Sequence, residues 1–207
     1  SIVRGIAEGR VAYANLRKVV YMLVSTGAAE ITLFLLALAF SLPMPLTAVQ
    51  LLWLNLVTNG LQDVALAAEK AEGDELSRPP RRPNEPIFDR LMRRRMIQAT
   101  LVMGVGGFVA YYLMLQWEIP EDHARSLLLL LCVLFENFQT LNSRSEHRSV
   151  FAQGFASNPW LVVTVFTAHG LHVAATYVPW LGETLALTPF SLVEWIILVG
   201  AASAVLV

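Results

Sequence analysis

The sequence predicts an all-α integral membrane protein, a bundle of six transmembrane helices with both termini in the cytoplasm. Three observations lead to this prediction. Of the 207 residues, 56% are hydrophobic and only 15% are charged, and the mean hydropathy is +0.55, which is too apolar for an ordinary soluble domain. Apolar stretches near the roughly 20 residues needed to cross a bilayer recur along the chain. Lys and Arg collect in alternate connecting segments.

The apolar stretches are paired through short connections. The first two are joined by SLPMPL, a turn that contains proline, the third and fourth by EIPEDHAR, and the fifth and sixth by VPWLGETLALTP. The fourth stretch is shorter than the others but strongly apolar. The predicted spans are residues 19–41, 46–68, 96–117, 126–142, 159–180 and 189–207.

The basic residues orient these spans. Of the 15 Lys and Arg residues, all but Arg125 fall on the face that also carries the two termini. Because Lys and Arg stay on the cytoplasmic side of a membrane, both termini are expected to be cytoplasmic. Arg93, Arg94 and Arg95 lie at the mouth of the third span and are interpreted as a topology anchor. Binding of anionic lipid is the alternative interpretation.

Three regions follow from this pattern. Residues 1–68 form a cytosolic stalk and the first helical pair, residues 69–95 a cytosolic loop rich in Pro and Arg, and residues 96–207 the remaining four-helix membrane region. The prolines of RPPRRPNEP deny the loop a helix and favour an extended path. The expected surroundings are membrane lipid, in the plasma (inner) membrane of a bacterium. No nucleic-acid partner is expected.

Three of the predicted spans carry an acidic residue within their apolar region, namely Glu30, Asp63 and Glu136. An ionisable side chain at the centre of a membrane helix costs at least ~2.5 kcal/mol, so such residues tend to mark ion pathways or paired groups. Thr26 precedes Glu30 by one turn, and Gln139 follows Glu136 by nearly one turn. A single acid could instead be protonated and purely structural.

The second span has the densest set of polar residues, within LLWLNLVTNGLQD. Asn55, Asn59 and Asp63 are spaced i, i+4 and i+8, so they share one face of a helix, which Thr58 and Gln62 widen. The glycine after Asn59 could let this helix unwind and expose backbone carbonyls, as in the broken helices of transporters. Two alternatives remain open: the amides and hydroxyl could bond neighbouring helices, and Asp63 could touch water at the inner end.

The polar side chains on these three helices offer carboxylate, amide and hydroxyl oxygens, the ligands of a hard cation. Zinc or copper would require His or Cys. His169 and His172 could bind a metal or relay protons, but neither has an acid or cysteine close in sequence, so hydrogen-bonded packing is the favoured interpretation. Cys132, the only cysteine, lies within LLLLLCVLF and is interpreted as a buried apolar residue.

Several stretches of the sequence resemble P-type cation ATPases, the calcium-pump branch in particular. The sixth transmembrane helix and following cytosolic loop of that family resemble VQLLWLNLVTNGLQDVAL, followed here by RPPRRPNEPIF. The exit from the phosphorylation domain into the fifth helix is similar to SIVRGIAEGRVAYANLRKVVYMLVSTGAAE, and the eighth helix is similar to FENFQTLNSRSEHRS. The resemblance implies that the six spans are the fifth to tenth helices of such a pump.

The resemblance implies a pump in which ATP phosphorylates an Asp of a cytosolic domain and the resulting shape changes alternate access to a cation site. The expected partners are that domain, contacted by loop 69–95, and the first four helices of the parent chain. ATP and Mg²⁺ are expected for the parent, and no cofactor for this chain. By motif, the ligand positions of the family fall on Glu30, Asn55, Thr58, Asn59 and Glu136.

Two positions depart from the calcium-pump pattern. Gly27 stands where those pumps have an Asn, three residues before the acid of the fifth helix, and Asn59 stands where they have an Asp. Asp63, one turn further on, is a candidate for the missing charge. Because ligand charge tunes divalent-cation affinity, the ion is left open among calcium, another divalent cation, a monovalent ion and a proton.

The phosphorylation motif DKTGT and the dephosphorylation motif TGE do not occur in these 207 residues. No catalytic residue and no ATP hydrolysis are therefore expected from this chain alone. The leading interpretation is the C-terminal membrane domain of a P-type cation pump. The alternatives are a stand-alone six-span ion carrier or channel, and a non-catalytic membrane subunit derived from a pump. Without the first four helices, polar faces would lack partners, so the isolated chain could oligomerise.

Overall fold

The computed structural model describes residues 2–71, 76–77, 86–145 and 158–206, and all regular secondary structure in that part of the chain is helical. The all-α class predicted from the sequence is confirmed for these residues. The helices are α1 (Ile2–Ala39), α2 (Ala48–Trp53), the π-helix η1 (Leu54–Asn59), α3 (Gly60–Ala67), α4 (Arg90–Gln116), α5 (Glu121–Ser143), α7 (Pro159–Tyr177), α8 (Pro179–Thr184), α9 (Leu192–Ala202) and the 3₁₀-helix η3 (Ser203–Val205).

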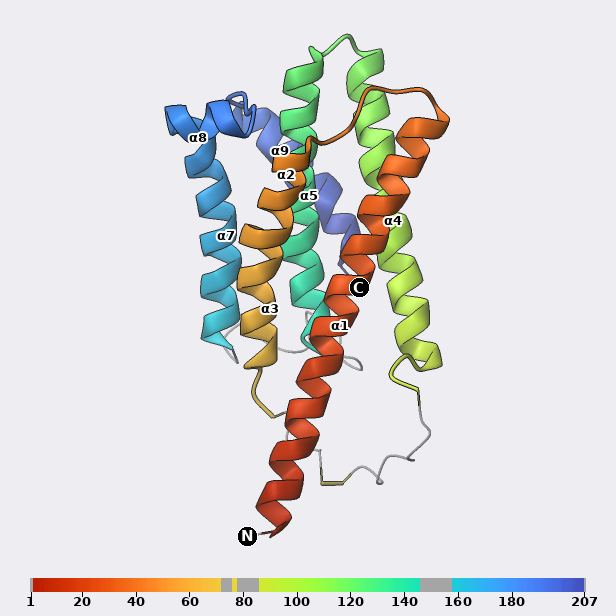
Figure 1. Cartoon of the computed structure of the whole chain (residues 1–207), viewed down its shortest axis with the longest axis vertical. Coiled ribbons are helices and arrows are strands. Elements are labelled where there is room, and N and C mark those ends of the chain that lie inside the picture. Colours follow the sequence, from red (N-terminus) through yellow and green to blue (C-terminus); the bar gives the residue numbers. More distant parts are fainter. Residues whose placement is uncertain (1, 72–75, 78–85, 146–157, 207) are drawn as a thin grey trace.

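The two ends of the bundle differ (Figure 1). At one end, called basal below, α1 begins, α3 ends and α4 begins. At the opposite, apical end lie the connections from α1 to α2 and from α4 to α5, together with the short helix α8. The first turns of α1 extend past the other helices at the basal end. The basal end therefore carries the N-terminus and the two flanks of loop 69–95, which were predicted to be cytoplasmic.

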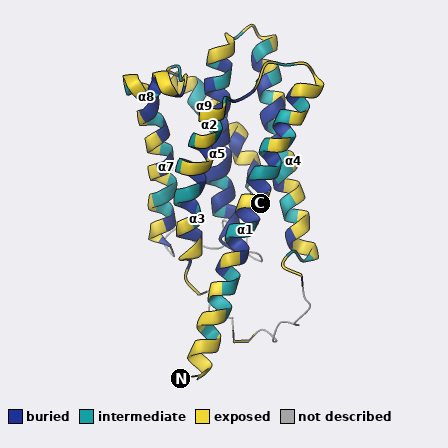
Figure 2. Ribbon diagram, in the orientation of Figure 1, coloured by how far each residue is buried: buried dark blue, intermediate teal, exposed yellow. Residues whose placement is uncertain are grey.

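The central helix of the bundle is α5. Of its most apolar 18 residues, 83% are buried, against 33% in the corresponding stretches of α1 and α4 (Figure 2). Its run LLLLLCVLF is apolar on every side, which is typical of a helix surrounded by other helices. By contrast, α1 and α4 each keep an apolar face exposed, and these faces would contact lipid in a bilayer.

At one position α1 and α4 approach so closely that no side chain fits between them. A Cβ atom added to Gly104 would lie 2.8 Å from Thr32 Cβ and 2.9 Å from the Ala29 carbonyl oxygen. Small residues that let two helix backbones approach are typical of packing between membrane helices. Because Glu30 adjoins Ala29, this contact also fixes where α1 places its acidic side chain.

Three helices, α1, α4 and α5, are long and apolar enough to cross a membrane. The fourth predicted span was too short, because the polar segment EDHAR is already the first turn of α5. The fifth and sixth were too long, since α8 is separate from α7, and α9 is short. The count of six spans therefore stays a prediction. The Pro-rich stretch 78–85 and the connection 146–157 lie outside the described residues.

The predicted topology anchor lies at the basal start of α4. Arg93 and Arg94 are exposed there. Arg95 instead donates a hydrogen bond of 3.0 Å from Nη1 to the Ser145 carbonyl oxygen, just beyond α5. Two of the three cations are thus available to a membrane surface or to the cytosol, and the anchoring role itself stays a prediction.

The first turn of α4 is fixed by Asp89. Its carboxylate accepts a 2.8 Å hydrogen bond from the Met92 backbone N–H, as an N-cap does, and a 2.6 Å bond from Arg17 of α1. Partial burial alone would raise the pKa of Asp89, but the Met92 N–H and the Arg17 guanidinium outweigh it and hold the pKa below its ordinary value. The charged form of Asp89 therefore stabilises the fold.

We expect Asp89→Asn to lower the melting temperature of the purified protein at about pH 7, by no more than the ~1 kcal/mol typical of a partly exposed ion pair. Asn still caps a helix, so the loss reports the charge, whereas Asp89→Ala should cost about 1 kcal/mol more. Because the native pKa lies below the unfolded value of about 3.9, the stabilisation is complete above that value and is lost as pH falls through the native pKa. The difference between wild type and Asp89→Asn should therefore shrink steadily as the pH is lowered below about 3.9, and a difference independent of pH would contradict this assignment.

Candidate cation site

The densest polar segment keeps its helical path but changes its winding. The chain runs through α2, η1 and α3 without a break, and Leu54–Asn59 forms a π-helix. Gly60 has the ordinary right-handed helical angles φ −58° and ψ −41°, so the unwinding predicted at this glycine is wrong. A π-helical turn inside a helix often marks a functional site. Here it contains Asn55, Thr58 and Asn59.

One side of the site joins α1 to the π-helix. The Asn55 side-chain amide donates to the Glu30 carboxylate, with distances of 3.1 and 3.2 Å to its two oxygens. The Asn59 amide in turn donates to Asn55 Oδ1 at 3.4 Å. The shared face predicted for Asn55 and Asn59 is therefore confirmed. Asn55 itself is exposed at the surface of the bundle.

The other side of the site is deeply buried. Thr58, Asn59 and Glu136 are only 0%, 1% and 3% exposed. Among the described residues, no hydrogen bond of ordinary length and angle is found for Thr58 Oγ1, Asn59 Oδ1 or either carboxylate oxygen of Glu136, although the Asn59 side chain interacts with the Glu136 carboxyl group. Asp63 Oδ1 also has no hydrogen-bond partner among these residues. Buried polar atoms are nearly always paired in proteins, so a cluster of unpaired oxygens points to a missing positive or hydrogen-bonding group.

A small cavity connects the two acids. Glu30 and Glu136 both line it, with Thr26 of α1, Leu54 of η1 and Cys132 of α5 among its other walls. Its volume is about 20 Å³, enough for one water-sized group. The cavity therefore brings α1 and α5 together at their acids, whereas the second polar segment reaches it only through the apolar side chain of Leu54.

The carboxylates do not all converge on one point. Within the described part of the chain, no three His, Cys, Asp or Glu side chains lie close enough together to hold a metal ion. Asp63 therefore does not complete a cluster with Glu30 and Glu136. A hard divalent cation takes six to eight oxygens, so ligands beyond these carboxylates are required.

Other polar residues of the same helices bond the bundle together. Gln62 donates to Asn137 Oδ1 at 2.5 Å and accepts from the Thr140 hydroxyl, joining α3 to α5. Gln139 donates to Ser25 Oγ at 3.0 Å, joining α5 to α1. Gln62, which widens the polar face of the second segment, and Gln139, nearly one turn after Glu136, thus have their amides committed to contacts between helices.

The sequence did not single out Ser25, Asn137 or Thr140, although all three are buried partners in these contacts. A signal was available for two of them. Asn137 and Thr140 are three residues apart, so they lie on one face of α5, next to the face that carries Glu136. Amides and hydroxyls at such spacing typically join membrane helices.

Of the remaining candidates, His169 makes the hydrogen-bonded packing contact that the sequence favoured, whereas no partner is found among the described residues for His172 Nδ1. His169 Nε2 accepts a hydrogen bond of 3.0 Å from the Trp195 indole N–H, joining α7 to α9. His172 is 1% exposed. Cys132 is buried, as predicted. The hydroxyl of Thr26, although at the cavity, donates to the Met22 carbonyl oxygen at 3.0 Å.

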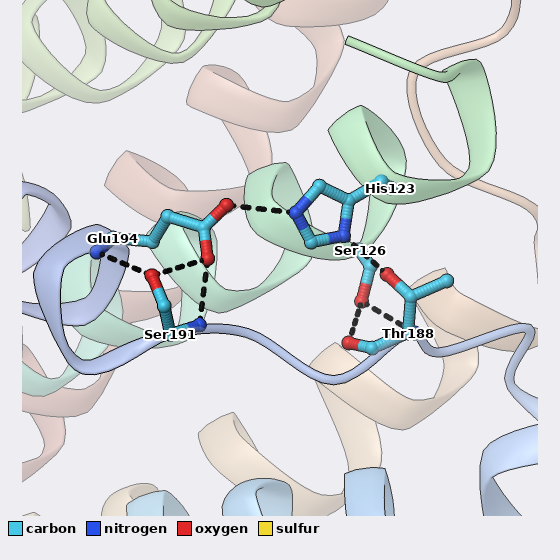
Figure 3. Close-up of polar contacts among 5 residues, drawn as sticks. All are labelled: His123, Ser126, Thr188, Ser191 and Glu194. Atoms are coloured by element: carbon cyan, nitrogen blue, oxygen red, sulfur yellow. Dashed lines mark hydrogen bonds and ion pairs between the residues drawn. The ribbon is translucent and has the colours of Figure 1, made fainter.

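A second polar cluster lies at the apical end, where the start of α5 meets the segment leading into α9 (Figure 3). His123 lies 2.6 Å from Thr188 Oγ1 and 2.8 Å from Glu194 Oε1, and Ser126 Oγ accepts from the Thr188 N–H at 3.0 Å. Ser191 and Glu194 form the capping box of α9. This cluster is internally hydrogen-bonded, which distinguishes a structural contact from the unpaired oxygens around Glu136.

The fold and the interior together define a class: a helical membrane domain whose core carries oxygen groups suited to a cation. The chain belongs to the family of cation-transporting ATPases, because residues 43–207 match the profile described as "Cation transporting ATPase, C-terminus". The resemblance inferred from the sequence motifs is therefore confirmed, and the chain corresponds to the C-terminal membrane domain of this family.

Calcium-transporting ATPases from several organisms are similar to the chain along nearly its whole length. It is 32% identical to the calcium-transporting ATPase of Bacillus subtilis over 98% of the chain, and 32% identical to calcium-transporting ATPase 1 of Lactococcus lactis, also over 98%. It is 26% identical over 99% of its length to calcium-transporting ATPase type 2C member 1 of Mus musculus. The matches span only 22–23% of these relatives.

Substitutions at the neighbouring residues Glu136 and Asn137 should have different effects on the stability of the fold. Asn137→Leu keeps the volume but leaves the buried Gln62 amide without its acceptor, so we expect the free energy of unfolding to fall by about 1 kcal/mol.

Glu136→Gln removes an unpaired buried carboxyl group, so the melting temperature without added cation should not fall. The same substitution should abolish any rise in melting temperature that a bound cation causes. An undiminished cation-dependent rise in Glu136→Gln would exclude Glu136 as a ligand.

Proposed function

We propose that this chain is the C-terminal membrane half of an ATP-driven P-type cation pump and supplies intramembrane oxygen ligands for the transported cation. The observation that carries the proposal is the set of buried oxygens without hydrogen-bond partners on Thr58, Asn59 and Glu136, together with the cavity that Glu136 shares with Glu30. In an apolar interior, such atoms are costly unless a cation or hydrogen-bond donor satisfies them. The alignment with calcium-transporting relatives supports a cation.

Each side chain has a distinct part in the proposed site. Glu30 and Glu136 provide negative charge from two helices, and Thr58 and Asn59 add neutral oxygens from the π-helix. Asn55 holds the Glu30 carboxylate and faces outward. Its exposure supports a site that is completed by the first four helices of the parent chain. Asp63 adds charge toward the basal side without direct coordination in this arrangement.

The proposed topology has six spans, with the basal end in the cytosol. The concentration of Lys and Arg at that end supports it. The parent would bind ATP and Mg²⁺ in its cytosolic domains, which loop 69–95 would contact, and would reside in the plasma membrane of a bacterium. Reaction of cysteines introduced at Lys70 and Glu183 with an impermeant reagent, applied from each side of the membrane, tests this orientation.

The first test uses the full-length pump that contains these residues. We expect Glu30→Gln and Glu136→Gln each to raise the half-saturating cation concentration for ATPase activity by about 10-fold or more, because a charge-assisted ligand contact is typically worth 1.5–3 kcal/mol. Initial rates should be measured against cation concentration. The matched control is Glu121→Gln, which breaks an exposed pair with Arg125 at the apical end.

Two outcomes of that titration would contradict the proposal. ATPase activity of the wild type that no cation stimulates would exclude a cation pump. Cation stimulation with an unchanged half-saturating concentration in both variants would exclude Glu30 and Glu136 as ligands, even in a genuine pump.

The departures from the calcium-pump pattern lead to a gain-of-affinity prediction. A Cβ atom added to Gly27 meets nothing within 4 Å, so an Asn side chain has room on the turn of α1 that precedes Glu30. We expect the double substitution Gly27→Asn and Asn59→Asp to lower the half-saturating calcium concentration by about 10-fold, because it restores an oxygen ligand and a charge. Unchanged calcium dependence, with the protein still folded, would show that a different ion occupies the site.

A further inference from the structure

The loop predicted to begin at residue 69 starts with a buried carboxylate. Glu69 is 8% exposed and follows the last turn of α3. Its Oε1 lies 3.2 Å from Arg144 Nη2, and its Oε2 accepts a 2.6 Å hydrogen bond from the Asn158 amide. Each carboxylate oxygen therefore has its own donor, one located just after α5 and the other just before α7.

The backbone at the same point is held from α1. The Asn15 amide donates to the carbonyl oxygens of Ala67 and Glu69, at 3.1 and 2.7 Å. The last carbonyls of a helix have no partner within the helix, so Asn15 satisfies groups that α3 leaves open. Asn15 is itself 4% exposed. The end of α3 is thus bonded to α1 through its backbone and to two other helices through Glu69.

Asn158 serves two elements at once. Its Oδ1 accepts a hydrogen bond of 3.1 Å from the Leu161 N–H and so caps α7, while its amide reaches Glu69. Arg144 and Asn158 are each 3% exposed. We call Asn15, Glu69, Arg144 and Asn158 the basal anchor. Through its buried polar contacts, the basal anchor joins α1 and α3 to the end of α5 and the start of α7.

The anchor is close to the proposed cation site along the helix. Glu69 lies ten residues beyond Asn59 and six beyond Asp63, or about 15 Å and 9 Å at 1.5 Å per residue. Between them, Ala65 and Leu66 pack in a separate apolar cluster with Met22 and Leu161. No break in the helix separates anchor and site, so a rotation or shift of α3 at its basal end would move the oxygens of Thr58 and Asn59.

We infer that Glu69 is a positioning residue for the cation site. Together with Asn15, Arg144 and Asn158, it fixes the rotation of α3 about its axis and the height of α3 in the bundle. The position of α3 in turn sets the affinity for the transported ion. The inference rests on the proposed function. A buried ion pair is a poor source of net stability compared with apolar packing, and fixing one unique arrangement is its better-attested use. Residues that orient metal ligands typically change affinity by 10–100-fold when they are replaced.

The test is a cation titration of ATPase activity in the full-length pump. Glu69→Gln should raise the half-saturating cation concentration about 10-fold, while the maximal rate per folded molecule stays within about twofold. Asn158→Asp still caps α7 but sets a second carboxylate against Glu69, so its shift should be at least as large. Glu121→Gln, the same chemical change in an exposed pair at the apical end, should leave the titration unchanged.

The outcomes separate the anchor from the pump itself. If the wild type shows no cation stimulation, or if Glu136→Gln has no effect, the proposed function fails. If Glu136→Gln acts as expected but Glu69→Gln and Asn158→Asp lower only the yield or melting temperature, with the half-saturating concentration unchanged, the anchor is merely structural and the inference is overturned. Shifts in both anchor variants, with Glu121→Gln unchanged, would establish the positioning role.

Discussion

Every polar group inside this bundle must find its partner within the protein, because the bilayer offers none. The central helix α5 shows how that constraint organises the structure. Gln139 is bonded to α1, and Asn137 is bonded to α3. Asn142 donates to the Val205 carbonyl oxygen in η3 at 2.6 Å. These contacts fix α5 against its neighbours, and within the described part of the chain both carboxylate oxygens of Glu136 are left without a hydrogen bond.

Satisfaction of hydrogen bonds therefore separates two kinds of polar residue that look alike in the sequence. The apical cluster of His123 and Glu194 and the Glu69 carboxylate of the basal anchor have hydrogen-bond partners and join helices, although Asn15 Oδ1 has no partner among the described residues. The oxygens of Thr58, Asn59 and Glu136, on η1 and α5, have no hydrogen-bond partner among the described residues. An acid in an apolar segment is thus informative only when its partners are known.

The sequence predicted the fold class and much of the site because both depend on local patterns. Apolar runs indicated helices, and the spacing of Asn55 and Asn59 indicated a shared face. Other features depend on contacts between distant segments. The commitment of Gln62 to α5, and the burial of Glu69 by donors 75 and 89 residues away, have no local signature. The π-helical winding of Leu54–Asn59 was missed because the adjacent glycine suggested a break instead.

The unpaired Glu136 carboxyl group also bears on how long such a protein survives in a cell. A ligand that binds only the folded state stabilises it by an amount that grows with the logarithm of its concentration, about 2.7 kcal/mol at 100 times the dissociation constant. A bound cation would therefore act as a folding ligand as well as cargo. Starvation for that ion would enlarge the unfolded fraction exposed to quality-control proteases, so the abundance of the protein in the membrane would follow the supply of the ion that it binds.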